Sequence, residues 1–491
     1  MRSFLSSLFS VKRPRPMQSL IAVVGATGTG KSKLAVDLAS RFNGEIINGD
    51  AMQMYRGLPI ITNQIPLEER NGIPHHLISC VELDEESWRV GMFRRECLRL
   101  IDDIRARGKL PILVGGTHYY TQSVLFKDNL VGKESTQDQE LESIPAEDLD
   151  SSIKWPILDA DPEVVMQKLR EVDPVMADRW HPKDTRKIRR SLEIYFQTGK
   201  PASQVYAEQK QLKQAVAAKD ESALGVGQLR FETMIFWVHS EKATLNDRLN
   251  KRVDDMIDQG LMSEANRMSD YLQEKESQGV TVDSTRGVWV SIGFKELAPY
   301  FEAVRDGSKT DKELETLKQT CIESVKTATR QYSGSQIKWI RNKLWNALAE
   351  AGLTGRLFVL DSSNVEDWAK NITDPSERLV QSLLKGEPLP DPKSLSDLAR
   401  TTLGAKEAQP QILDANPITK CMTCEVCQKT MTNEDQWNVH INGHAHKRVV
   451  KALARRAQRD EYLRKQQESL DNDQVKVNSG ASEQDSKTPP P

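Results

Sequence analysis

The stretch GATGTGKSKLAVDL, residues 25–38, decides the fold and raises the first question of function. It contains the pattern G-x-x-x-x-G-K-[ST]. The apolar run SLIAVVG before it and the helical periodicity after it give the strand–loop–helix context that the pattern requires. Backbone N–H groups converge on an anion at the start of a helix, while Lys31 adds charge and Ser32 offers a hydroxyl to a magnesium ion. We therefore predict a phosphate-binding loop, with a tight turn that binds nothing as the alternative, and the molecule that carries the phosphate stays open.

Two later segments, GEIINGD and KLPILVGGTH, repeat the pattern of a buried strand that ends in glycine or a polar residue, with helical sequence between them. Strands that alternate with helices imply a parallel sheet covered on both faces. We expect an α/β core in two parts, residues 17–160 and 230–365. The segment 161–229 between them is helical and strongly basic, which indicates an insertion domain.

The sequence after the core changes in composition. Pro, Ser, Asp and Lys are frequent in residues 366–418, which we interpret as a linker. Residues 419–448 hold a Cys and His cluster, 449–465 predict a basic helix, and 466–491 predict a disordered tail.

The chain has six cysteines, and three of them crowd together in this C-terminal region, which indicates a metal site rather than disulfides. Cys424, Cys427, His440 and His446 have the spacing of a two-cysteine, two-histidine zinc finger. Two donors are spare, Cys421 and His444, and the choice of His446 rests on family spacing. The predicted fold class is therefore a P-loop parallel sheet core with a helical insertion domain and a C-terminal ββα zinc finger that binds Zn²⁺, either for RNA contact or for structure alone.

Charge and hydropathy limit the location of the chain. The net charge is −2, and no apolar run reaches the roughly 18 to 20 residues of a membrane-spanning helix, so we expect no membrane insertion. Residues 1–16 contain four basic residues, several serines and no acid, which is typical of a mitochondrial presequence; a basic arm is the alternative. A start at Met17 would omit this segment, so we expect mitochondrial and cytoplasmic forms. The basic run 447–465 can also serve as a nuclear import signal.

Asp50 ends the run EIINGD on the element after the first helix. An ATPase or kinase would show a later apolar strand that ends in an acid for magnesium, but PILVGGTH ends in glycines. From the residues alone, Asp50 is either a base or a metal partner facing the bound phosphates.

The motifs from about residue 19 to 345 resemble those of the tRNA dimethylallyltransferases (tRNA isopentenyltransferases). In family order they are GATGTGKS, EIINGDAMQMYRGLPIITN, GIPHHLI, VGGTHYYTQ, VDPVMADRWHPKDTRKIRRSLEIYFQTGKP, LNDRLNKRVDDMIDQGL, SIGFKEL and TATRQYSGSQIKWIRN. The family transfers an allyl group from dimethylallyl diphosphate to the exocyclic amine of the adenosine 3′ of the anticodon. The resemblance implies that the loop holds diphosphate rather than ATP, through Gly25, Ala26, Thr27, Gly28, Thr29, Gly30, Lys31 and Ser32.

The resemblance also implies the catalytic roles. Asp50 is similar to the family's base, which removes a proton from the weakly nucleophilic amine. Lys31, Ser32, a Mg²⁺ ion and Arg252 are expected at the departing diphosphate, where negative charge develops. Arg252 has an alternative role in a surface ion pair with Asp254 or Asp255.

The expected macromolecular partner is the tRNA anticodon stem-loop, bound by a monomer. By resemblance, Asp50, Ala51, Met52 and Gln53 line the pocket of the extruded base. A serine often follows the aspartate in bacterial members, and Ala51 cannot replace its hydrogen bond. The resemblance adds further tRNA contacts at Thr117, Arg186, Lys187, Ile188, Arg189 and Arg190. A structural amide for Gln53, a turn-stabilising hydroxyl for Thr117 and a solvated face for the basic run are the alternatives.

Two other functions fit the phosphate loop. One is a P-loop kinase acting on a small molecule or nucleoside. The other is a nucleic-acid-binding NTPase whose finger and basic helix bind RNA without transferase chemistry.

Overall fold

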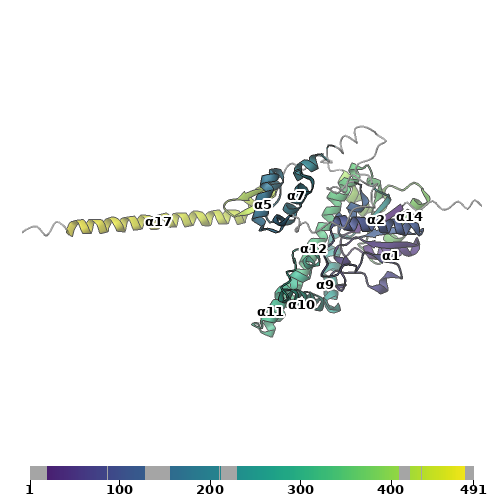
Figure 1. Ribbon diagram of the computed structural model, residues 1–491, viewed down its shortest axis with the longest axis horizontal. Coiled ribbons are helices and arrows are strands. Elements are labelled where there is room, and N and C mark those ends of the chain that lie inside the picture. Colours follow the sequence, from purple (N-terminus) through teal and green to yellow (C-terminus); the bar gives the residue numbers. More distant parts are fainter. Residues whose placement is uncertain are drawn as a thin grey trace, which may run out of the picture. The chain divides into compact units, whose positions relative to one another are not determined.

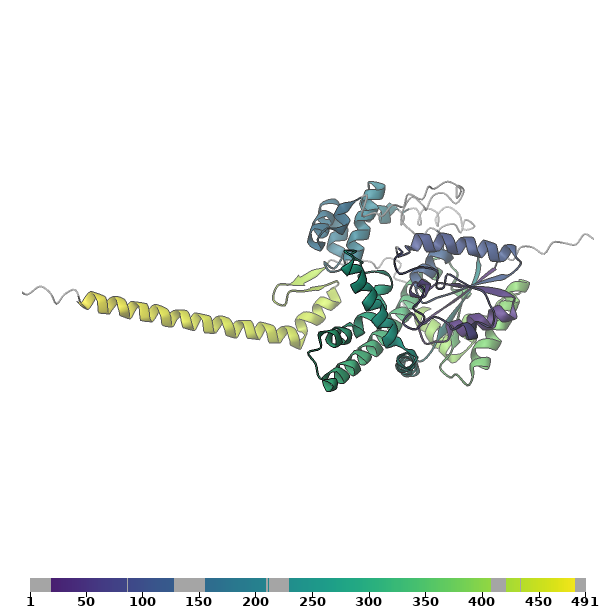
Figure 2. The ribbon, with the colours of Figure 1, turned by 60° about the horizontal axis from the view of Figure 1, so that its bottom comes forward.

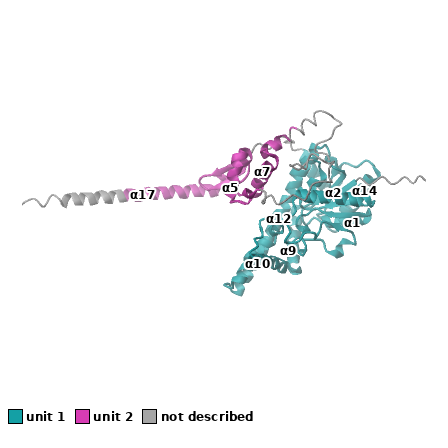
Figure 3. Ribbon diagram, in the orientation of Figure 1, with its two compact units in different colours: residues 1–130, 212–411 teal, residues 131–211, 412–491 magenta. Residues whose placement is uncertain are grey.

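The computed structural model describes residues 19–85, 87–127, 155–208, 211, 229–407, 421–432 and 434–481. The expected presequence, residues 1–16, lies outside these ranges. The chain divides into two compact units: unit 1 comprises residues 1–130 and 212–411, and unit 2 comprises residues 131–211 and 412–491 (Figure 3).

Unit 1 is built around a six-stranded sheet in the order β3-β2-β4-β1-β5-β6, in which every pair is parallel. The strands are β1 (Ser19–Gly25), β2 (Gly44–Asn48), β3 (His75–His76), β4 (Leu110–Val114), β5 (Glu232–His239) and β6 (Leu357–Asp361). β1 is central, and it pairs with β5 from Ser19 opposite Glu232 to Gly25 opposite Val238. Since parallel strands end at the same edge, the loops after β1, β2 and β4 meet there. The predicted α/β parallel fold is confirmed.

Successive residues of β1 point to opposite faces of the sheet and enter separate apolar clusters. Leu20 and Ala22 pack with α2 (Val90–Ala106), α3 (His118–Leu125) and the long helices of the unit. Ile21 and Val23 pack with α1 (Lys31–Arg41) and α14 (Asp374–Lys385), on the other face (Figures 1 and 2). Burial on both faces explains why these strands read as continuous apolar runs.

A group of long helices follows β5. They are α9 (Lys242–Gln259), α10 (Leu261–Ser277), α11 (Phe294–Asp306) and α12 (Asp311–Trp339) (Figure 2). α12 begins with a capping box in which Thr310 and Glu313 exchange hydrogen bonds, and it continues through the π-helical turn η6 (Ile340–Leu344) into α13 (Trp345–Glu350). The C-terminal half of α12 runs back to the carboxyl edge of the sheet.

The linker interpretation of residues 366–418 is wrong for much of its length. α14 and α15 (Asp397–Glu407) both lie in this segment, and their apolar side chains are buried. Leu379 and Val380 join the cluster under α1, while Leu403 joins the cluster on the opposite face. These two helices are therefore part of the core. The prediction failed because the many polar residues of the segment outnumber the apolar residues that share one face of each helix.

Unit 2 contains the expected helical segment, with α5 (Pro162–Val172), α6 (Pro174–Arg179) and α7 (Thr185–Thr198). Each helix starts with an aspartate whose side chain accepts a backbone N–H: Asp161, Asp173 and Asp184. The helices enclose a small core of their own that includes Leu169, Ile188 and Leu192. Residues 212–228 of the predicted insertion lie outside the described ranges.

The finger in unit 2 has the expected ββα order, with β7 (Met422–Cys424), β8 (Lys429–Met431) and α16 (Glu434–Asn442). Its first residue reaches the helical segment: Cys421 donates its backbone N–H to the Asp178 carbonyl at 2.8 Å. α17 (His444–Ala481) contains the predicted basic helix but continues to Ala481 (Figure 1), so the tail expected from residue 466 begins in a helix.

Candidate active site

The phosphate loop between β1 and α1 is shaped by its glycines. Gly28 and Gly30 have φ angles of 86° and 90°, a region that favours glycine. A Cβ atom on Gly30 would lie 2.5 Å from the Trp368 ring. Inside the loop, Thr29 Oγ1 and Lys31 Nζ donate to the Ala26 carbonyl at 2.9 and 2.7 Å. These two hydrogen bonds tie the side chains of Thr29 and Lys31 to the backbone of the loop.

Lys31 lies at the start of α1, with Ser32 next to it. Burial lowers the pKa of the Lys31 ammonium to about 8, although the nearby Asp50 carboxylate opposes this shift, and Arg252 adds to it. Lys31 and Arg252 repel each other in this low-dielectric environment, and an anion bound between them would reduce that repulsion. The loop is thus poised to bind a negatively charged group.

Asp50 follows β2, where Asn48 holds the turn: Asn48 Oδ1 accepts the Asp50 N–H at 3.0 Å, and Asn48 Nδ2 donates to the Asp50 carbonyl at 3.0 Å. Burial raises the pKa of the Asp50 carboxyl. The Met52 N–H, Lys31, the Thr117 hydroxyl and the Gly116 N–H act against this rise. A desolvated carboxylate with fixed donors is the kind of group that acts as a general base.

Thr117 and Gly116 come from the loop after β4. Thr117 Oγ1 accepts the Ala51 N–H at 3.1 Å, so this hydroxyl holds the Asp50 turn as well as the carboxylate. A Cβ atom on Gly116 would lie 2.9 Å from Asp50 Oδ2. Only glycine lets the backbone come this close to the carboxylate.

Gln336 on α12 joins the two loops. Its side-chain Oε1 accepts the Thr27 N–H at 2.8 Å, and its Nε2 donates to the Gly116 carbonyl at 3.0 Å. Tyr332, one helical turn earlier, hydrogen-bonds to Gln336 and Thr117, and burial together with Asp50 raises the pKa of its hydroxyl. Sequence reasoning missed Gln336 and Tyr332, although both lie in the motif TATRQYSGSQIKWIRN.

Arg252 reaches the phosphate loop from α9, where its Nη1 donates to Thr27 Oγ1 at 2.8 Å. Burial lowers the pKa of its guanidinium, with Asp255 opposing the shift. The structure therefore brings Arg252 together with Lys31, Asp50 and Thr117 at one edge of the sheet.

Met52 and Gln53 lie in the short helical turn η1 (Met52–Met54) after Asp50 and Ala51. The Gln53 side-chain Nε2 donates to the Asn63 carbonyl at 2.9 Å. Gln53 therefore acts as a structural amide, which is the alternative to contact with the base.

His118 begins α3 beside this site. Its ring stacks on Trp339 with centroids 5.4 Å apart, and neither ring nitrogen has a hydrogen-bond partner among the described residues. Burial, followed by Lys31, lowers the pKa of the imidazole to about 3, so His118 is neutral.

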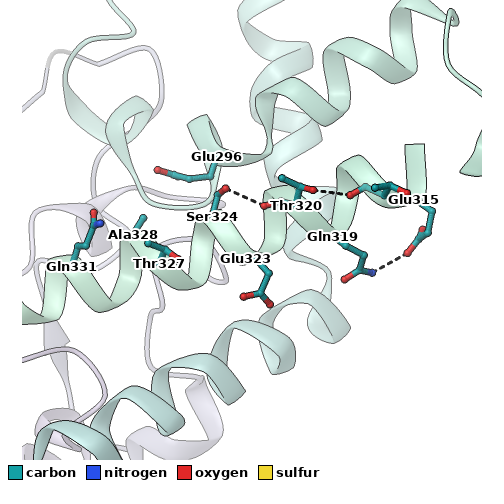
Figure 4. Close-up of a pocket in the computed structure, with 10 residues that line it drawn as sticks. Glu296, Glu315, Gln319, Thr320, Glu323, Ser324, Thr327, Ala328 and Gln331 are labelled. Carbon is teal, nitrogen blue, oxygen red and sulfur yellow. Dashed lines mark hydrogen bonds between the residues drawn. The ribbon is translucent and has the colours of Figure 1, made fainter. Parts of the chain in front are cut away.

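A separate open groove of about 940 Å³ lies along α12 (Figure 4). Glu296, Glu315 and Glu323 give it a negative character. The hydroxyls of Thr320 and Ser324 donate to carbonyls one turn earlier in the same helix, so they are already satisfied. Nothing in this groove resembles the phosphate loop.

The basic segment on α7 belongs to unit 2. Ile188 points into the core of the unit and cannot contact RNA with its side chain. Arg189 pairs with Asp159, Lys187 with Asp184 at 2.7 Å, and Arg190 with Glu193 at 3.1 Å. Arg186 is exposed on the same helix.

The metal site of unit 2 is formed by Cys424, Cys427, His440 and His446, whose donor atoms lie within 4.8 Å of one another. The His446 Nδ1 atom is 3.6 Å from Cys424 Sγ and 3.4 Å from Cys427 Sγ, while the buried His440 Nε2 has no hydrogen-bond partner. Two thiolates and two imidazoles fit a tetrahedral Zn²⁺ site. The spare donor Cys421 points elsewhere, because its Sγ donates to the Arg179 carbonyl at 3.4 Å.

Comparison with known proteins gives two family matches: IPP transferase over residues 53–343, and a zinc finger of C2H2 type over residues 422–446. The chain is 38% identical over 452 residues to a tRNA dimethylallyltransferase of Schizosaccharomyces pombe, an overlap that covers 90% of this chain and 97% of that protein. It is 34% identical over 463 residues to the tRNA dimethylallyltransferase of Saccharomyces cerevisiae, covering 92% and 97%.

A solved structure extends the likeness to the fold. It is a crystal structure of a eukaryotic dimethylallyltransferase acting on tRNA, with a TM-score of 0.67 and 33% identity over 91% of this chain and 99% of that one. Among the helices that the structure describes, none has a stretch both long and apolar enough to cross a membrane.

Proposed function

Since the chain belongs to the IPP transferase family, we propose that it transfers a dimethylallyl group from dimethylallyl diphosphate to the exocyclic amine of the adenosine 3′ of the anticodon in tRNA, releasing diphosphate. The observation that carries the proposal is the position of Asp50. Its desolvated carboxylate and the phosphate-loop ammonium of Lys31 interact directly through their charges, so an acceptor for a proton and a binding site for diphosphate share one edge of the sheet.

The reaction joins the amine nitrogen to the allylic carbon and breaks the bond from that carbon to the diphosphate oxygen. The amine proton moves to an Asp50 carboxylate oxygen, which the Met52 N–H and the Thr117 hydroxyl hold in place. Lys31, Arg252 and the backbone N–H groups of residues 25–32 stabilise the negative charge on the departing diphosphate.

Mg²⁺ is part of the proposal. The Ser32 hydroxyl at the start of α1 is an oxygen ligand of the kind that this ion prefers, and it lies in the loop proposed to hold the diphosphate. A bound Mg²⁺ would neutralise charge on the diphosphate oxygens.

The tRNA contacts are proposed on both units. In unit 1, the Met52 N–H and the Thr117 hydroxyl contact the Asp50 carboxylate, and the Ala51 N–H donates to Thr117 Oγ1; we place the extruded adenine beside these groups. In unit 2, the exposed cations of α7 and α17 suit the RNA backbone, whose binding is electrostatic and weakens with salt. The zinc finger would orient α17 for this contact.

A monomer in mitochondria and cytoplasm is the proposed state of the protein. The basic, acid-free residues 1–16 support the mitochondrial form, and size-exclusion chromatography with light scattering tests the monomer.

The test of the proposed function is an assay with labelled dimethylallyl diphosphate, unmodified anticodon stem-loop RNA and Mg²⁺, run beside an assay with labelled ATP. Transfer of label to the RNA, and its loss when the target adenosine is replaced, supports the transferase. ATP hydrolysis or phosphoryl transfer without labelled RNA would favour the kinase or NTPase function instead.

A further inference from the structure

Trp368 covers the phosphate loop of unit 1 from the outside. It follows β6 and directly precedes the π-helical turn η8 (Ala369–Thr373), and a Cβ atom on Gly30 would lie 2.5 Å from its indole ring. Because Gly30 is the residue before Lys31, the ring contacts the loop where α1 begins. The match to the IPP transferase family ends at residue 343, so Trp368 lies outside the matched region.

The indole ring is held in this place by α1. Its N–H donates to Asp37 Oδ2 at 3.2 Å, and the ammonium of Lys33 lies over the ring at 5.2 Å from its centre. Lys33 and Asp37, one helical turn apart, also form an ion pair at 2.9 Å. A movement of Trp368 away from the loop would therefore break both a hydrogen bond and a cation–π contact.

Trp368 covers the side of the loop that faces away from Asp50. The ammonium of Lys31 lies close enough to Asp50 and Arg252 for their charges to act on its pKa. Lys33 is two residues further along α1, so its side chain points in nearly the opposite direction, over Trp368. An allyl group that reacts beside Asp50 leaves the loop on the Lys31 side. The other end of its diphosphate carries no substituent, so the Trp368 side needs no space for a ligand.

A nucleotide needs space on the Trp368 side. A phosphate loop holds the α- and β-phosphates with its backbone N–H groups, while its lysine reaches the β- and γ-phosphates. The nucleoside is attached to the α-phosphate, so it extends away from the lysine. In this chain that direction leads to the indole ring of Trp368.

The outer surface of the loop is also filled at Gly28. A Cβ atom there would lie 2.8 Å from Leu249 Cδ2 and 3.1 Å from Leu245 Cδ1, and both leucines belong to α9. Leu249 is fully buried, so its removal would leave an enclosed cavity, whereas Trp368 is partly exposed and its removal would open the loop to solvent. Trp368 is therefore the side chain that controls the entry of a bulky group.

We propose that Trp368 is a specificity-determining residue that excludes nucleosides from the phosphate loop, so that the loop accepts an allyl diphosphate and rejects nucleoside di- and triphosphates. The inference rests on the proposed function, because it explains how a loop of the nucleotide-binding type serves an allyl donor. Discrimination by a clash acts against the competitor and requires no additional contact with the accepted ligand.

The experiment measures the binding of ADP and of inorganic diphosphate, each with Mg²⁺, to the full-length native protein and to Trp368→Ala by calorimetry. The native protein should bind ADP more weakly than diphosphate. In Trp368→Ala the ratio of the ADP affinity to the diphosphate affinity should rise by about tenfold or more. Addition of Lys31→Met to Trp368→Ala should abolish the gained ADP binding, which would locate the nucleotide in the phosphate loop.

Trp180→Ala is the matched control. The indole N–H of Trp180 also donates to a side chain, Ser191 Oγ at 2.9 Å, and Lys187 lies over its ring at 5.0 Å, but Trp180 belongs to unit 2. This variant should keep the native ratio of affinities. Thermal melting shows whether each variant folds, and Trp368→Leu replaces Trp368→Ala if the latter does not.

Three results would overturn the proposal. The first is a folded Trp368 variant whose ratio of affinities equals that of Trp180→Ala. The second is weaker ADP binding in the Trp368 variant, which would make the indole ring a stacking platform for a base. The third is native protein that binds ADP as tightly as diphosphate. Allyl transfer to RNA is measured separately, so the proposed function fails only if that transfer is absent.

Discussion

Gln336 accepts a hydrogen bond from the backbone N–H of Thr27 at 2.8 Å, although the two residues are 309 positions apart in the chain. The same carboxamide donates to the Gly116 carbonyl, beside Asp50. One buried side chain on α12 thus fixes the phosphate loop relative to the turn that holds the proposed base.

Replacing Gln336 by Leu should therefore impair both loops. The change leaves the Thr27 N–H and the Gly116 carbonyl without partners, at a cost of about 1–3 kcal/mol for each buried group that stays unpaired. We expect at least a tenfold loss in kcat/KM for the allyl donor and a lower melting temperature. Gln319→Leu is the control, since Gln319 is exposed on the same helix. Equal activity in the two variants would show that the bridge has no role in catalysis.

Asp50→Asn should reduce kcat by a factor on the order of 10²–10⁴, the range for loss of a general base, while RNA binding is retained. Burial raises the pKa of the native carboxyl, so the native rate should increase with pH as Asp50 ionises. The pH profile of kcat/KM tests this, because the variant should lack that limb. Turnover in Asp50→Asn close to the native rate would remove Asp50 from the role.

The buried Asp50 carboxyl should also affect the stability of the protein. A carboxyl whose pKa is raised by folding binds its proton more tightly in the folded state, so its contribution to stability is lost as pH rises through the folded pKa. Asn cannot ionise and avoids this cost. We expect Asp50→Asn to melt at the same or a higher temperature than the native chain above that pH. A clearly lower melting temperature there would contradict a desolvated charge at this position.

Donor binding should weaken in alkaline solution. The folded-state pKa of Lys31 is lowered to about 8, mainly by burial, so the free protein loses this charge as pH rises through that value. The kcat/KM for dimethylallyl diphosphate should fall above pH 8, and Lys31→Met should be poor at every pH without this limb. Lys33→Met is the control, because Lys33 lies on the same helix but is exposed and pairs with Asp37 at 2.9 Å. If Lys33→Met lowers kcat/KM as much as Lys31→Met does, the loss comes from the charge on the surface of α1 and not from Lys31 at the phosphate site.

Removal of zinc should act on RNA affinity rather than on chemistry. A finger of this size depends on its metal to fold, so Cys424→Ser or chelation should release zinc and raise KM for tRNA, with kcat largely kept at saturating tRNA. Zinc content and steady-state kinetics measure the two effects. Cys421→Ser should keep its zinc, since Cys421 lies outside the ligand cluster. An unchanged KM after zinc loss would leave the finger without a role in binding tRNA.

Local patterns in the sequence predicted the phosphate loop, the parallel α/β core and a two-cysteine, two-histidine zinc site, whereas the choice of His446 over His444 came from the spacing in the family that the chain resembles. Each depends on residues close together in the chain, where spacing reflects geometry directly. Gln336 could not be assigned in this way, because its partners Thr27 and Gly116 become neighbours only when α12 returns to the sheet. Pro, Asp and Ser around Leu379, Val380 and Leu383 favour a linker by composition, although these three apolar residues share one buried face of α14.

The hydrogen bond from Cys421 to the Asp178 carbonyl bears on how the protein can be shortened. A fragment that stops before residue 412 keeps α6 but discards Cys421, which caps the last turn of α6, and it exposes the Asp178 and Arg179 carbonyls to water. Fragments for spectroscopy should therefore retain both chain segments of unit 2 or omit both, since either one alone loses the hydrogen bonds between Cys421 and the last turn of α6.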